Sequence, residues 1–415
     1  MITRPQLTLA LCAIFIFSLV YSPFLLSMSM IGLLFVSILD WQRAEGRLKI
    51  KLNLSIKLII NTLQYNPAYL SVTLCFFLVL LSGWQTEDWS YWFSRLRIKL
   101  PFLLLPLVFV NLPAFSKRQY LGLVYFLLLL LLVTCLGVGI NYLLHFEKIT
   151  NSLEHGKSIP VPCNHIRFSL ILVLGVIGGG WLWWERYAYR YNWERLLIGF
   201  TTLFLISFIF LLSVRSGLLA LYSGLFILLI YYIHSTRRYW KAAMMTSAMA
   251  FAPVTAYFFL PSFNAKMDYM QEDLEMHQKG KGEHYSDSGR LTSIEVGLDI
   301  GNEHPLLGVG AGNLKQEVEE AYEAEHPESI EPKMPHNQWV HTYAGTGIFG
   351  VILFTFAFFY PLLHHGFFKK PVFLAFNSVI FSSFLTESTI ENALGVGIYA
   401  FFLLLGLHYM QQHHD

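Results

Sequence analysis

The sequence has few charged residues and few cysteines for its length. Charged residues occupy 13% of the 415 positions, and 29 Lys and Arg nearly balance 27 Asp and Glu. No basic run of the kind that follows a phosphate backbone is present, so nucleic acid is not an expected partner. Three of the four cysteines lie in apolar runs, and none forms a CxxC pair. Neither a disulfide framework nor a cysteine metal site is therefore expected.

Nucleotide-binding and zinc-protease motifs are also missing. The sequence has no GxxxxGK[ST] loop, no GxGxxG after a strand and no HExxH. Chemistry driven by a nucleotide or by a nucleotide sugar is therefore not indicated, and no cofactor is expected.

Apolar residues, by contrast, are abundant. Hydrophobic residues make up 55% of the chain, aromatic residues 16%, and the mean hydropathy is +0.49. A membrane-spanning helix needs about 20 mostly apolar residues. This criterion predicts an all-α polytopic membrane protein with about twelve transmembrane helices, near residues 6–22, 24–40, 67–84, 100–115, 120–144, 168–184, 196–213, 217–234, 242–260, 336–361, 371–386 and 393–410.

The orientation of these spans follows from their flanking charges, because Arg and Lys near span ends tend to remain in the cytoplasm. Basic clusters mark five predicted cytoplasmic loops, which begin at Arg43, Lys117, Arg186, Arg237 and Lys369. With twelve spans, both termini are also cytoplasmic. The cluster of Arg95, Arg97 and Lys99 does not fit this pattern and predicts a separate interfacial helix.

The same reading divides the chain into three parts. Residues 1–260 form an N-terminal bundle of about nine spans, residues 261–335 form a long loop outside the cytoplasm, and residues 336–415 form about three further spans. Apolar spacing predicts short helices in the loop near 263–279, 288–301 and 311–325. The glycines of LLGVGAGN predict a turn between two of them.

Two arginines stand out on the side opposite the cytoplasm. Arg290 is the only arginine in the segment 261–335, and Arg215 lies between two apolar runs in LLSVRSGLLAL, where an arginine is costly unless it faces water or a partner. Arg290 could instead form an ordinary surface ion pair, and Arg215 could snorkel to the interface. If both face one cavity, their guanidinium groups suit a phosphate or pyrophosphate.

A histidine lies where the tenth span begins. His336 follows Pro335 and precedes Asn337, which could cap the helix or hydrogen-bond the ring. A neutral imidazole can remove a proton from a hydroxyl group, although a histidine at a helix start is often only an interfacial polar residue. His341 lies on another face of the helix and is the weaker candidate.

Further polar residues lie on the same predicted side. His165 and Arg167 begin the sixth span, where they could contact lipid headgroups or a substrate. Glu387 and Glu391 are four residues apart, which predicts one shared helical face and a role in capping or ion pairing.

A sixteen-residue pattern identifies a family resemblance. His336 and Asn337 are followed by nine residues and then by Gly347, Gly350 and Val351. This pattern resembles the signature of the O-antigen ligase family of bacterial membrane glycosyltransferases, which also includes Wzy-type polymerases. Arg290 followed by Ile294 is similar to a second family element, with isoleucine where leucine is more usual, and Arg215 is similar in context to a third. The resemblance covers the chain from about residue 200 onward.

The resemblance implies a fold, a location and a reaction. It implies a GT-C-like helical protein of the Gram-negative inner membrane that works at the periplasmic face. The donor is a glycan on undecaprenyl pyrophosphate and the acceptor is a sugar of lipid A-core, so no nucleotide is needed. His336 would accept the proton of the acceptor hydroxyl, or position that hydroxyl. Arg290 and Arg215 would hold the diphosphate.

Secondary roles follow from the same resemblance. Arg167 would be a third diphosphate contact, His165 and Asn337 would lie near the substrates, and Glu387 would orient one of the basic groups. The short turn YSPF (residues 21–24) contains no acid, and no DxD pair occupies an early loop on the predicted periplasmic side, so we expect transfer without a metal. A direct single displacement would invert the anomeric centre.

Two other functions compete with the ligase. A Wzy-type polymerase would use the same donor with a second lipid-linked glycan as acceptor. A transporter or flippase for a lipid-linked sugar would predict paired repeats with broken helices and ionisable groups near the bilayer midplane. No such internal symmetry is visible in the sequence.

Overall fold

The computed structural model describes residues 3–44, 47–52, 64, 67–278, 286–325 and 331–413. Nine helical segments in these ranges are long and apolar enough to cross a membrane. They contain α1 (Arg4–Tyr21), α4 (Ala68–Leu81) with η1 (Ser82–Gln85), α6 (Lys117–Leu144), α8 (His165–Trp184), α9 (Glu194–Leu212), α10 (Arg215–Thr236), α11 (Tyr239–Phe259), α15 (Gln338–Leu363) with η3 (His364–Lys369), and α17 (Ala393–Gln412). Two shorter apolar helices are α2 (Pro23–Ile38) and α16 (Pro371–Thr386). The predicted helical, multi-pass character is confirmed, and the count of twelve spans stays a prediction.

The basic cluster at residues 95–99 is not a separate interfacial helix. It belongs to α5 (Trp89–Val110), one continuous helix that also contains most of the predicted fourth span. The Asp88 side chain caps this helix by accepting a hydrogen bond from the Tyr91 N–H. Lys99 is buried but lies 2.6 Å from the Glu391 carboxylate, so its charge is compensated inside the bundle. The sequence predicts a helix boundary near Lys99 because nothing in the neighbouring residues indicates that Glu391 compensates its charge.

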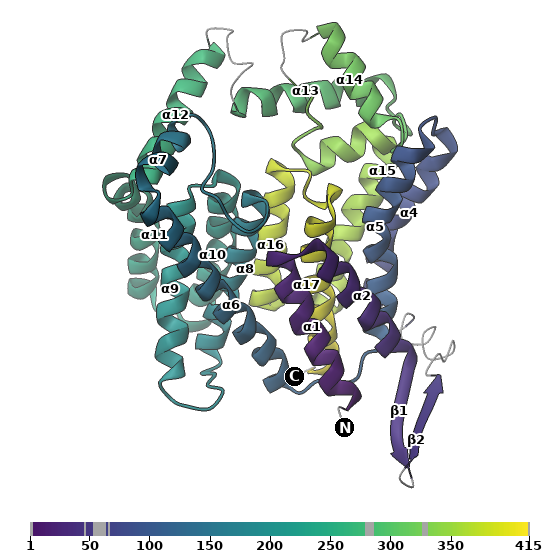
Figure 1. Ribbon diagram of the computed structural model, residues 1–415, viewed down its shortest axis with the longest axis vertical. Coiled ribbons are helices and arrows are strands. Elements are labelled where there is room, and N and C mark those ends of the chain that lie inside the picture. Colours follow the sequence, from purple (N-terminus) through teal and green to yellow (C-terminus); the bar gives the residue numbers. More distant parts are fainter. Residues whose placement is uncertain are drawn as a thin grey trace.

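A two-stranded hairpin departs from the all-α expectation. Strands β1 (Leu39–Ala44) and β2 (Arg47–Leu52) pair antiparallel, with Leu39 opposite Leu52 and Ala44 opposite Arg47. The hairpin follows α2 and lies where a cytoplasmic loop was predicted. Figure 1 shows it projecting from the end of the bundle where both chain ends also lie.

The opposite end of the bundle carries the helices of the long central segment. These are α12 (Pro261–Gln278), α13 (Ser286–Glu303) and α14 (Leu314–Glu325), with α7 (Phe146–Glu154) beside α12 (Figure 1). The three predicted short helices therefore agree closely with the observed ones. We call this side of the molecule the loop end.

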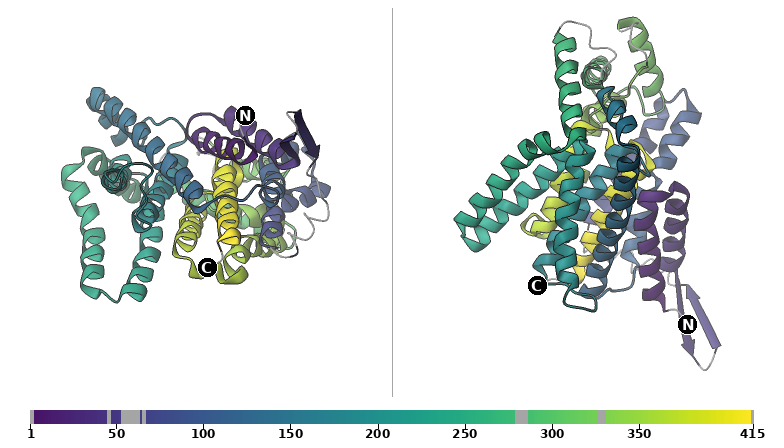
Figure 2. Two further views of the ribbon diagram at one scale, coloured as in Figure 1. Left: turned by 90° about the horizontal axis from the view of Figure 1, so that it is seen from below. Right: turned by 60° about the vertical axis from the view of Figure 1, so that its left-hand side comes forward.

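Close packing of helices through small residues sets the geometry below the loop end. A Cβ on Gly217 of α10 would lie 2.5 Å from the Ser169 hydroxyl of α8, and one on Gly224 would lie 2.9 Å from Val379 of α16. Small residues let backbones approach in this way when lipid provides no hydrophobic drive for association. The helices α8, α10 and α16 are thereby held together, whereas α11 lies toward the outside of the molecule (Figure 2).

Candidate active site

The start of α15 fixes His336 in place. Asn337 caps this helix, because its side-chain oxygen accepts hydrogen bonds from the Trp339 and Val340 amides. The Asn337 amide nitrogen donates to the Leu385 carbonyl, 3.1 Å away. The His336 N–H donates to the Ser293 hydroxyl of α13. Asn337 therefore joins the start of α15 to the end of α16, and the His336 N–H joins the same point to α13.

The signature glycines have a structural explanation in the same helix. Gly347 interrupts the helical backbone of α15 with φ +63° and ψ −168°, and a Cβ there would lie 2.3 Å from the Leu306 carbonyl. The segment 305–310 packs into this break. The Val309 and Gly310 amides donate to carbonyls of α15, and the Ile348 amide donates back to the Pro305 carbonyl. The glycine thus connects the loop end to α15 by backbone hydrogen bonds.

The helix that carries Arg290 packs tightly on the beginning of α15. A Cβ on Gly297 of α13 would lie 2.5 Å from Pro335, and one on Gly301 would lie 2.3 Å from the Tyr343 ring. This close approach brings Arg290, which lies two turns before Gly297, to the side of His336 where Glu387 is found.

Glu387 is the common partner of three basic groups. Its Oε1 atom lies 2.9 Å from Arg290 Nη2, and its Oε2 atom lies 3.2 Å from His336 Nδ1 and 3.6 Å from Arg167 Nη1. The Glu387 side chain is 5% exposed, whereas those of Arg290 and His336 are 24% and 27% exposed. The carboxylate is therefore buried beneath groups that remain partly accessible.

Arg167 contacts the loop after α16 as well as Glu387. Its guanidinium lies 3.5 Å from the Ser388 carbonyl, and its Nε atom is buried with no hydrogen-bond partner among the described residues. Asn164 caps α8 just before it, accepting hydrogen bonds from the Ile166 and Arg167 amides. Burial of an arginine at the end of a span requires a compensating anion, which Glu387 provides.

Arg215 and Lys266 extend this group of charges. Arg215 is the first residue of α10, after a turn in which Ser213 has φ +54°. Electrostatic interactions couple Arg215 to Arg290 and Asp273, and couple Lys266 of α12 to both Arg215 and Arg290. The side chains of four cations from α8, α10, α12 and α13 thus gather at the loop end.

The electrostatics of the site follow from burial and charge. Burial alone would raise the pKa of Glu387, but His336, Arg290 and Arg167 outweigh it, so the pKa lies below its ordinary value and the carboxylate is ionised near neutral pH. An ionised carboxylate only accepts hydrogen bonds, so a neutral His336 ring must donate from Nδ1. Its Nε2 atom then carries the lone pair.

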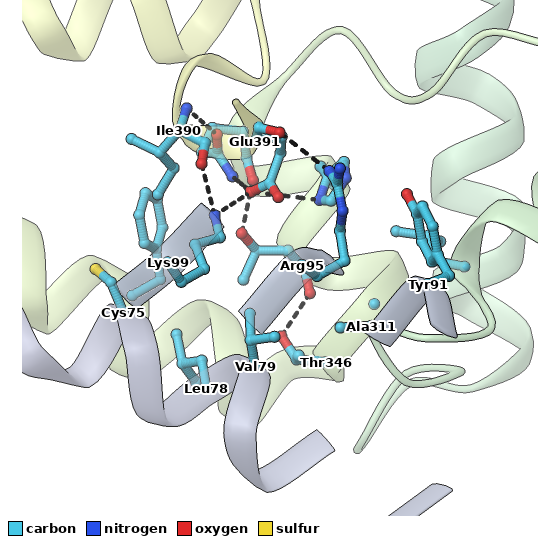
Figure 3. Close-up of a pocket in the computed structure, with 16 residues that line it drawn as sticks. Cys75, Leu78, Val79, Tyr91, Arg95, Lys99, Ala311, Thr346, Ile390 and Glu391 are labelled. Carbon is cyan, nitrogen blue, oxygen red and sulfur yellow. Dashed lines mark hydrogen bonds and ion pairs between the residues drawn. The ribbon is translucent and has the colours of Figure 1, made fainter. Parts of the chain in front are cut away.

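A second buried ion-pair group lies next to the first. Glu391 Oε1 is 2.6 Å from Lys99 Nζ and 2.7 Å from Gln338 Nε2, and Arg95 donates to the Glu391 carbonyl (Figure 3). These residues line a small cavity with His341, whose Nδ1 is 3.8 Å from Glu391. Burial opposes ionisation, yet Lys99 and His341 hold the pKa of Glu391 to about 2. This group ties α5, α15 and the 387–391 loop together.

The structure unites most of the predicted site residues and adds two elements that sequence reading missed. His336, Arg290, Arg167 and Glu387 are in direct contact, and His165 senses the charges of Arg167, Arg290 and Lys266. The prediction that Glu387 and Glu391 share a helical face is wrong, because α16 ends at Thr386. Lys266 and the Lys99–Glu391 pair had no local sequence signal.

Comparison with known proteins gives a match for part of the chain. Residues 200–355 match the family model described as O-antigen ligase, and a search of curated proteins gives no match. The matched segment runs from α9 through the Gly347 break of α15 and includes Arg215, Lys266, Arg290 and His336. The helices identify a multi-pass membrane protein. Over residues 200–355 the chain is similar to the O-antigen ligase family.

Proposed function

We propose that the protein is an O-antigen ligase, which transfers a glycan from undecaprenyl pyrophosphate to a sugar of lipid A-core. The observation that carries the proposal is the contact of one buried carboxylate, Glu387, with both His336 and Arg290. That contact combines a candidate base with a candidate phosphate-binding guanidinium in one site.

In the proposed reaction, the acceptor hydroxyl oxygen attacks the anomeric carbon of the donor sugar. His336 Nε2 accepts the hydroxyl proton, and Glu387 holds the ring in the required tautomer and stabilises the imidazolium that forms. The bond from the anomeric carbon to the phosphate oxygen breaks, and the electron pair leaves with undecaprenyl pyrophosphate. A single displacement of this kind inverts the anomeric centre and requires no metal in the mechanism.

The diphosphate is bound by cations from several helices. Arg290 and Arg215 contact the diphosphate. The more deeply buried Arg167 adds positive charge on the inner side of the site, where it contacts Glu387. Fixed cations in a partly dry site stabilise charge that develops on the leaving oxygen more than water can. His165 lies close enough to sense these charges and is the further candidate for substrate contact. Asn337 acts by holding α15, since its amide already engages three backbone groups.

The proposal includes a membrane orientation. The loop end faces the periplasm of a Gram-negative inner membrane, both termini face the cytoplasm, and the chain divides at 260 and 335 into two membrane parts and one periplasmic segment. The position of both chain ends opposite α12 to α14 supports this arrangement (Figure 1). The lipid-borne donor and acceptor then meet at the membrane surface.

The test uses purified protein, an undecaprenyl-pyrophosphate glycan and lipid A-core in detergent with EDTA. Wild type is compared with His336→Ala and with His304→Ala, a control at an exposed histidine of the same segment. A glycan-bearing lipid A-core formed by wild type and the control, but not by His336→Ala, supports the ligase. Lengthening of the lipid-linked donor without core modification would assign the protein as a polymerase instead. Movement of the lipid between leaflets without transfer would reject catalysis.

A further inference from the structure

Lys266 is a partly buried lysine among other positive charges, an environment that the sequence around it does not predict. It lies on α12, half-buried, and its Nζ atom donates to the Gly156 carbonyl, 2.9 Å away. Gly156 has φ +80°, and a Cβ there would lie 2.8 Å from the Tyr269 ring. This loop is therefore fitted against α12, and the carbonyl that orients the ammonium group is fixed.

The charges around Lys266 are unfavourable to its own charge. Arg215 acts on it from α10, Arg290 from α13, and His165 interacts with it from α8. On α12 itself, the Tyr269 ring faces the ammonium at 5.6 Å, and the loop after α7 presents the Gly156 carbonyl. Within the described ranges, no carboxylate lies within ion-pair distance of Lys266, and α9 and α11 add no charge that acts on it.

These surroundings alter the protonation of Lys266. Burial and the positive charges of Arg215 and Arg290 lower the pKa of Lys266 to about 8. A lysine ammonium has three donors, of which the Gly156 carbonyl occupies one. An anion brought beside Lys266 would offset the repulsion from Arg215 and Arg290 and accept hydrogen bonds from the remaining donors.

We propose that Lys266 is a further ligand of the donor diphosphate and that it takes up a proton when the diphosphate enters the site. This inference rests on the proposed function for the identity of the anion. The anionic diester offsets the repulsion among Arg215, Arg290 and Lys266, so the charged ammonium becomes the favoured form in the complex. Donor binding is then linked to proton uptake, and affinity falls as Lys266 loses its proton in the empty site.

The expected size of the effect follows from the protonated fraction of the empty site. If only the charged form binds, the apparent dissociation constant scales with the inverse of that fraction, and a pKa of about 8 gives affinity about 30-fold weaker at pH 9.5 than at pH 7. Lys266→Arg keeps the charge at both pH values and should show little of this loss. Lys266→Gln should bind roughly ten- to a hundredfold more weakly at pH 7, through loss of a charged hydrogen bond, and with little dependence on pH.

The experiment is calorimetry of detergent-solubilised full-length protein with a short-chain prenyl diphosphate sugar, a diester that itself does not titrate between pH 7 and 9.5. Lys148→Gln, an exposed lysine on α7, is the matched control and should behave as wild type. At pH 8.5, measurements in buffers of different ionisation enthalpy should show uptake of most of one proton by wild type and of almost none by Lys266→Arg. The arginine variant tests the proposal even if Lys266→Gln fails to fold.

Several results separate this inference from the proposed function. Equal pH dependence in wild type and Lys266→Arg, or unchanged affinity in Lys266→Gln, would overturn the role of Lys266. Normal proton-linked binding without any glycan transfer would support the Lys266 site and reject the ligase. A folded wild type that binds no diester at any pH would overturn both.

Discussion

Replacement of Glu387 by glutamine tests the relation between Glu387 and His336 directly. Arg290 requires an acceptor at 2.9 Å, so the introduced amide should turn its oxygen toward Arg290 and its NH₂ group toward His336 Nδ1. His336 Nδ1 must then accept, which places the ring proton on Nε2 and removes the basic nitrogen from the reaction. Loss of general-base catalysis typically costs about 10²- to 10⁴-fold in rate. We expect Glu387→Gln to reduce glycan transfer by this amount at saturating donor and acceptor.

The matched control for this substitution lies in the same loop. Glu391→Gln makes the same chemical change in a neighbouring ion-pair group that is also largely buried, but its partners are Lys99 and Gln338. Removal of one partner from a buried pair commonly costs about 3–5 kcal/mol, so both variants should melt at lower temperature. Only Glu387→Gln should lose transfer per folded molecule, measured after gel filtration. Wild-type turnover by folded Glu387→Gln would refute the reasoning.

Three further outcomes follow from the structure. Gly347→Ala should destabilise the protein by about 2–4 kcal/mol, because the new Cβ would meet the Leu306 carbonyl at a backbone conformation that only glycine tolerates. Gly137→Ala, where the new Cβ has no neighbour within 4 Å, should not destabilise it. Thermal melts compare the two variants, and equal melting temperatures would contradict this explanation of the signature glycine. The difference in free energy of unfolding between wild type and Glu391→Gln should narrow by about 2 kcal/mol from pH 7 to pH 3. The reason is that the low pKa of Glu391, about 2, stabilises the fold above pH 4.5, and this contribution is lost as the pH falls toward 2. A constant difference would show that Glu391 does not titrate as inferred. Arg290→Lys should raise the KM for the donor at least about tenfold, because a lysine keeps the charge but lacks the planar guanidinium that can contact Glu387 and a phosphate together. An unchanged KM would exclude Arg290 from the diphosphate site.

The sequence predicted best what depends on neighbours in the chain. The spans follow from runs of apolar residues, and the turn at LLGVGAGN follows from its glycines, two of which have positive φ. His336 was identifiable from its motif. The geometry explains why the motif includes Gly347: without a Cβ, this residue leaves room for the backbone of the 305–310 segment.

Pairings between distant residues were not predictable from one sequence. Lys99 and Glu391 are separated by 292 positions, and Arg290 and Glu387 by 97. No local pattern links the members of either pair, so Lys99 was assigned to an interfacial helix. Lys266 gave no signal because its unusual environment arises only when α12 packs on α7 and α13 and brings the ammonium group near Arg215 of α10.

The concentration of positive charge at the loop end has a consequence for turnover under the proposed function. A donor diester carries two negative charges, whereas the undecaprenyl pyrophosphate left after transfer gains most of a third near neutral pH, because a terminal phosphate titrates near pH 6. Arg215, Arg290 and Lys266 should therefore hold the spent carrier more tightly than the fresh donor. The site that binds the donor would then bind the product more strongly. Release of the carrier, rather than formation of the glycosidic bond, would be the rate-limiting step.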